Sequence, residues 1–142
     1  MAHSNKNLAN KNSETKNNPD KVGDLEQLKV AVLVTDGVEE KELTEPVEFL
    51  KKHGAQVKLI SDHSGYVQAF HHQDKTIQIP IDFTFEDPFA KPEYYDALLL
   101  PGGALNADTL RMNPHLCIFP EAPCIFYIIL DSMVACEFSI FN

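Results

Sequence analysis

Cysteines, basic residues and long apolar runs are all scarce in this chain. Three cysteines at irregular spacing among 142 residues do not make the disulfide framework of a secreted domain, so we expect a reducing, cytoplasmic setting. Only 12 basic residues stand against 21 acidic ones, and the formal charge of −9 argues against nucleic acid or an anionic membrane as partners. No apolar stretch is long enough to span a bilayer.

The amino-terminal segment is poor in apolar side chains. It is rich in Asn, Lys and Ser and contains no apolar core of a secretory signal. Such a composition offers too little apolar surface to offset the entropy lost on ordering. We therefore expect residues 1–27 to form a disordered tail, and the folded part to begin at Leu28.

One apolar run, with the acidic turn that follows it, organises the rest of the chain. The run covers residues 30–34 and stops at the turn residues Thr35, Asp36 and Gly37. A continuous run of this kind predicts a strand buried on both faces, as in a parallel sheet covered by helices. Ligands bind beyond the carboxyl ends of such strands, so we expect function in residues 35–42. Three acids lie there: Glu39, Glu40 and Glu42.

A helix and a second strand are predicted next. Leu43, Val47 and Leu50 recur at helical spacing, and Gly54 supplies a stop signal. Pro46 either lies in the first helical turn or kinks a helix that begins earlier. Residues 56–60 then predict a strand, which completes a strand–helix–strand unit.

The middle of the chain predicts irregular structure. Residues 66–70 and 76–79 alternate in polarity and predict two short strands at the margin of the sheet, joined as a hairpin. Prolines punctuate residues 80–92, which predict a loop with local turns.

A further buried strand is predicted over residues 95–100, and it ends in Pro-Gly-Gly at 101–103. Two glycines at this place allow the backbone to approach a ligand or another turn closely. A helix is predicted over residues 106–112, with Asn106 as its N-cap. Residues 116–142 contain no Gly, Lys or Arg and show no helical period, and residues 124–130 combine strand propensity with the composition of an aggregation-prone segment.

Three motifs together resemble the PfpI-like family of cysteine peptidase-like and deglycase proteins. They are TDGVEEKELTEP after the first strand, YYDALLLPGG, and DTLRMNP, and the match runs from about residue 29 to 114. The resemblance implies an α/β fold, a flavodoxin-like three-layer sandwich with a mostly parallel sheet. It divides the chain into a tail (1–27), the amino-terminal part of a PfpI-like domain (28–114) and an anomalous apolar tail (115–142). The carboxyl-terminal half is expected to be incomplete, through truncation or a frameshift.

The resemblance also implies site residues, of which two carry over to this chain and the nucleophile does not. In the family, a cysteine within Ala-x-Cys-His-Gly meets a glutamate from the turn after the first strand, and a Pro-Gly-Gly backbone N–H faces the reacting oxygen. The glutamate carries over to Glu42 and the backbone donor to Gly103. Cys136 lies near the expected distance, roughly thirty residues beyond Pro-Gly-Gly, but no His-Gly follows it. We therefore expect the chain to lack the family's thiol chemistry.

Each candidate also has a purely structural interpretation. An acid at Glu42 stabilises a helix amino terminus through the macrodipole, and Glu39 and Glu40 are expected to do only this. Gly103 can serve a tight turn alone. Three histidines, His63, His71 and His72, lack the spacing of a zinc motif, so no metal or other cofactor is expected.

Three hypotheses for function follow. By resemblance, the chain is a thiol-dependent hydrolase, deglycase or glyoxalase-type stress-response protein that acts on a small carbonyl or peptide substrate, forms a homo-oligomer, and is inactive as this chain. Alternatively, it is a catalytically silent truncated fragment or a protein-interaction module. A flavodoxin-like phosphate binder is disfavoured, because the first turn lacks a glycine-rich phosphate motif and its acids would repel phosphate.

Overall fold

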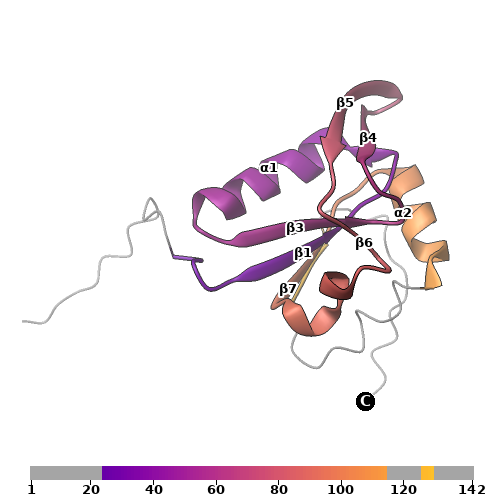
Figure 1. The fold of residues 1–142 in the computed structure, drawn as a ribbon. Coiled ribbons are helices and arrows are strands. Elements are labelled where there is room, and N and C mark those ends of the chain that lie inside the picture. The colour runs from indigo at the N-terminus through magenta and orange to yellow at the C-terminus, as the bar shows by residue number, and fades with distance from the viewer. Residues whose placement is uncertain (1–23, 115–125, 130–142) are drawn as a thin grey trace, which may run out of the picture.

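The computed structural model describes residues 24–114 and 126–129, and its centre is a five-stranded sheet in the order β6-β3-β1-β7-β8 (Figure 1). Every neighbouring pair in this sheet is parallel. The predicted mostly parallel sheet is therefore confirmed. Its strands are β1 (Lys29–Leu33), β3 (Gln56–Ser61), β6 (Phe83–Thr84), β7 (Ala97–Leu100) and β8 (Phe126–Ile129).

A second sheet of three strands stands beside the first, in the order β2-β4-β5. It consists of β2 (Val38–Glu39), β4 (Tyr66–His71) and β5 (Asp74–Pro80). The predicted hairpin is confirmed, since β4 and β5 are antiparallel, but its placement at the margin of the main sheet is wrong. Strand β4 pairs instead with β2, inside the acidic turn, because the side chains of Val67 and Ala69 are fully buried in the core on that side.

Helix α1 (Glu40–Lys52) buries the predicted stripe of Leu43, Val47 and Leu50. Pro46 lies inside the helix, so the alternative in which the helix begins earlier is the correct one. The helix ends at the predicted stop, where Gly54 adopts a φ of +93°. This early start places Glu42 in the first helical turn.

Helix α2 (Ala104–Met112) corrects two predictions. It starts two residues before the predicted start, and its N-cap is Gly103. Asn106 is not the cap: it lies within the helix, and its side chain is fully buried. The physical reason is that its side-chain amide forms hydrogen bonds with Thr35, in the turn after β1, and with Pro101, in the turn after β7.

The segment predicted as a loop over residues 80–92 contains more regular structure than expected. It includes strand β6, which pairs with the end of β3, and the short 3₁₀ helix η1 (Pro88–Ala90). A second 3₁₀ turn, η2 (Pro92–Tyr94), leads into β7. The strand predicted over 124–130 is confirmed where it is described, as β8.

The core has one layer on each face of the main sheet. On one face, Val30 and Val32 of β1 pack with the buried stripe of α1. On the other, Ala31 and Leu33 pack with Leu110 of α2 and with η1. Strand β1 is buried on both faces as predicted, and the layers form a flavodoxin-like three-layer sandwich (Figure 1).

The packed structure already includes the turn at residues 24–27. The backbone N–H of Leu25 donates to the carbonyl of His53, and the Leu25 and Leu28 side chains pack against the core. The first 23 residues lie outside the described part, and their predicted disorder stays a prediction. None of the helices in the described ranges has the length and apolar character needed to cross a bilayer.

Candidate functional site

A cavity of about 720 Å³ opens at the carboxyl ends of β1 and β7. Its walls come from the turn after β1, the first turn of α1, the β4–β5 hairpin and the start of α2. The lining residues are Gly37, Glu39, Lys41, Glu42, Phe70, His72, Gln73, Gly103, Ala104 and Leu105. This is the edge of a parallel sheet at which ligands are expected to bind.

Glu42 and Gly103, the two site residues carried over from the family, both line this cavity. Glu42 is half-buried, and its Oε2 atom is shielded from solvent. Glu42 lies in the first turn of α1, at the amino-terminal end of the helix. The structure thus brings together a carboxyl group and a glycine turn that lie far apart in the sequence.

Gly103 is required by packing, whatever its chemistry. Its φ is +111°, and a Cβ atom built there would lie 2.4 Å from the carbonyl oxygen of Gly37 and 2.8 Å from the backbone nitrogen of Glu39. The N–H of Glu39 donates to the carbonyl of Gly102 at 3.0 Å. The two turns therefore touch backbone to backbone, which is one of the close approaches that the sequence predicted for Pro-Gly-Gly.

Asn106 holds these turns together from a buried position outside the cavity lining. Its Oδ1 accepts hydrogen bonds from the N–H of Thr35 at 2.7 Å and from the Thr35 hydroxyl at 3.2 Å. Its Nδ2 donates to the carbonyl of Pro101 at 2.8 Å. The sequence had suggested Asn106 as a helix cap. Its spacing of four residues from Leu110 puts both side chains on one face of the helix, and this was the signal that could have shown its burial.

Glu39 binds the tip of the β4–β5 hairpin through both carboxylate oxygens. Oε1 accepts from Nδ1 of His71 at 3.0 Å, and Oε2 accepts from the backbone N–H of His72 at 3.0 Å. Partial burial opposes ionisation, but these two hydrogen bonds and the attraction of both imidazoles outweigh it and lower the pKa of Glu39 below its ordinary value. The expectation that Glu39 acts only through the macrodipole is incomplete.

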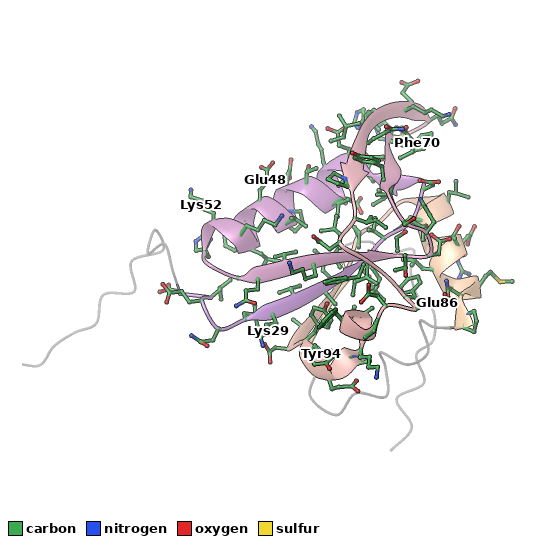
Figure 2. All side chains as sticks on the ribbon, viewed as in Figure 1. Lys29, Glu48, Lys52, Phe70, Glu86 and Tyr94 are labelled. Atoms are coloured by element: carbon green, nitrogen blue, oxygen red, sulfur yellow. The ribbon has the colours of Figure 1, made fainter. Side chains whose placement is uncertain are left out.

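The hairpin supplies the outer wall of the cavity. Figure 2 shows Phe70 at the end of β4, beside the hairpin tip, and this residue and His72 both line the cavity. The rings of His71 and His72 lie 4.4 Å apart, centroid to centroid. Sequence reasoning treated these histidines as part of a polar loop, since neither spacing nor period indicated that β4 would pair with the acidic turn.

No cysteine belongs to the part of the chain that the structure describes. Cys117, Cys124 and Cys136 all lie outside it, so the placement of Cys136 at the cavity stays a prediction. Across residues 24–114 and 126–129, no three His, Cys, Asp or Glu side chains gather as a metal site would require.

Comparison with protein-family models places residues 28–119 in the DJ-1/PfpI family. The chain belongs to the DJ-1/PfpI family. The resemblance drawn from the motifs is thereby confirmed. Because the matched region contains Glu42, Gly103 and both turns that carry them, the cavity lies within the part of the chain that the family model covers.

Relatives in the DJ-1/PfpI family share the same region. An uncharacterized protein from Staphylococcus epidermidis is 40% identical over 83 residues, which cover 58% of this chain and 45% of that protein. A deglycase from Thermococcus kodakarensis is 33% identical over 86 residues, covering 61% of this chain and 48% of the deglycase. The chain thus spans about half the length of the curated relatives that it matches.

A solved structure supports the fold. DJ-1 from Schizosaccharomyces pombe aligns with a TM-score of 0.58 at 21% sequence identity, over 72% of this chain and 57% of the other. At this identity the likeness establishes the flavodoxin-like fold and carries no information on activity.

Proposed function

We propose that the Glu42–Gly103 cavity is the carboxyl and backbone-donor half of a thiol-dependent site of hydrolase or deglycase type. The observation that carries the proposal is the convergence of Glu42 and Gly103 on one cavity at the carboxyl end of a parallel sheet. Membership of a family that includes a relative named as a deglycase supports the reaction class. The substrate class is a small carbonyl compound or a peptide.

The chemistry assigns one task to each group. A thiolate attacks the carbonyl carbon, and the negative charge that forms on the carbonyl oxygen needs a hydrogen-bond donor such as the N–H of Gly103. A protonated carboxyl group at Glu42 donates a hydrogen bond to the thiolate, which lowers the pKa of the thiol. Neither group reacts alone, so the proposal requires a cysteine at the mouth of the cavity.

For the nucleophile, Cys136 is the candidate nearest to the family pattern. It is followed by Glu137 and Phe138 rather than by His-Gly, so the residues that support the family's thiolate are absent from this sequence. We therefore propose that the chain has no turnover on its own.

Alkylation by iodoacetamide at about pH 6 tests this proposal, because a free thiol with a pKa near ~8.5 reacts slowly there. We expect slow labelling and no consumption of methylglyoxal by the wild-type chain. Rapid labelling that is lost in both Cys136→Ala and Glu42→Gln, together with turnover, would make Cys136 an active nucleophile. Glu48→Gln, an exposed acid on the same helix, is the matched control for Glu42→Gln. Turnover that survives replacement of all three cysteines would refute thiol dependence altogether.

A second candidate function is a silent interaction module that assembles with copies of itself. Large apolar side chains on its surface favour this reading: Phe89, Tyr94, Leu105 and Met112 are each half exposed or more. Sedimentation of the purified chain tests the candidate, with association expected. A stable monomer at high concentration would exclude it.

A further inference from the structure

His72 has a strained backbone. Its φ is +57°, and it is the one residue other than glycine with a positive φ within the described ranges. It opens the two-residue turn between β4 and β5, a position where glycine or asparagine is the usual choice. Strain of this kind persists where the surroundings enforce it, and it collects at binding sites.

Glu39 holds the turn that contains this residue through two hydrogen bonds. Its Oε2 accepts from the backbone N–H of His72, and its Oε1 holds the neighbouring His71 ring. Glu39 is the residue that precedes α1, and its own N–H bonds the carbonyl of Gly102. The strained residue is therefore fixed, through one side chain, to the same turn that presents Gly103.

His72 lines the same cavity as Glu42 and Gly103, and it is exposed, so it lies on the open side of that cavity. The walls beside it are apolar, from Phe70 and Leu105. An imidazole carries both a donor and an acceptor, and in this cavity a small ligand with adjacent oxygens can use them together with the carboxyl group. Glycine in this turn would avoid the strain but would remove that group.

We propose that His72 is a ligand-contacting residue that donates a hydrogen bond to the carbonyl oxygen of a small α-hydroxy or α-oxo carbonyl compound, and that Glu39 is its positioning residue. The ligand class rests on the proposed function. The contact itself needs no thiol, so it can be tested in a chain without turnover.

The test is titration of the isotope-labelled full chain with hydroxyacetone, a neutral α-hydroxy ketone, followed through the amide signal of Gly103. We expect saturable shifts in the wild type. His72→Gly should bind about tenfold more weakly or worse, the cost of one lost hydrogen bond, while its thermal midpoint stays equal or rises because the strain is relieved. Lys75→Gln, on the exposed strand of the same hairpin, should keep the wild-type affinity.

A purely structural role for His72 predicts the opposite pattern, in which His72→Gly binds as the wild type does. That result would overturn the inference, and so would a wild-type chain whose Gly103 signal does not respond. His72→Asn, which also tolerates the left-handed conformation, should bind as weakly as His72→Gly. Weak binding by both variants would show that the loss does not come from the extra backbone freedom of glycine. Replacing all three cysteines by serine should leave binding unchanged, so a failure of thiol chemistry and a failure of this contact are distinguishable.

Discussion

The amide of Asn106 joins the two turns that build the cavity, since its Oδ1 accepts from Thr35 at 2.7 Å and its Nδ2 donates to Pro101 at 2.8 Å. One turn follows β1 and leads to Glu42, and the other follows β7 and contains Gly103. Asn106 has no exposed surface, so water cannot replace either partner. The spacing of the two candidate site residues therefore depends on a buried side chain that lies outside the cavity.

Asn106→Ala is predicted to lower the free energy of unfolding by about 2–4 kcal/mol, because a buried donor at Thr35 and a buried acceptor at Pro101 each lose a partner. Urea denaturation gives the value. Met112→Ala, at an 83% exposed position on the same helix, is the control and should change stability by less than about 0.5 kcal/mol. Equal effects of the two substitutions would refute the role assigned to the amide.

Gly103→Ala is predicted to cost about 2–5 kcal/mol, from the left-handed φ of +111° together with a clash against the backbone of Gly37 and Glu39. Gly65→Ala is the matched control, since Gly65 has a φ of +98° and no atom within 4 Å of an added Cβ. It should show the conformational cost alone, about 1–2 kcal/mol. A Gly103 variant no less stable than the Gly65 variant would contradict the close approach of the turns.

Acid should weaken the contact between Glu39 and the hairpin. The pKa of Glu39 is lowered from 4.5, so the stability that this carboxylate contributes is fully present above about 4.5 and is lost as the pH falls through its folded value. Glu39→Gln should therefore be less stable than the wild type near neutral pH, with the gap closing below that point. Thermal midpoints along a pH series measure this, and Glu48→Gln, an exposed acid on the helix that follows Glu39, supplies the control. A gap that stays constant with pH would exclude the carboxylate as its source.

His63 should have the opposite pH dependence. A hydrogen bond to Asp62 at 2.8 Å is the main cause that raises the pKa of His63 above 6.5, with further help from the carbonyl of Tyr66 and the charge of Asp36. The stability from this histidine is fully present below 6.5 and is lost as the pH rises through its folded value. His63→Gln should therefore be destabilised at about pH 6 and closer to the wild type at about pH 8.5. Equal destabilisation at both pH values would count against the prediction.

Local pattern accounts for the parts of the fold that sequence reasoning predicted correctly. The continuous apolar run of β1 requires burial on both faces, and the spacing of Leu43, Val47 and Leu50 requires a helix packed by one side. Both requirements depend only on residues that lie close together in the sequence. The motifs around Glu42 and Gly103 are equally local, which is why the family and these two candidate site residues could be predicted from the chain alone.

Long-range pairing decided the rest. The pairing of β4 with the two-residue β2, the bond from Glu39 to the hairpin and the burial of Asn106 each join segments more than 25 residues apart in the sequence. No periodicity specifies such partners, because a short strand or a polar side chain satisfies its hydrogen bonds with whatever the packed core brings near. The sequence determined the parallel sheet, its covering helix and the two turns at its carboxyl edge. Only the tertiary structure decided that His72 would line the cavity that those turns form, since its position depends on which strand the hairpin joins.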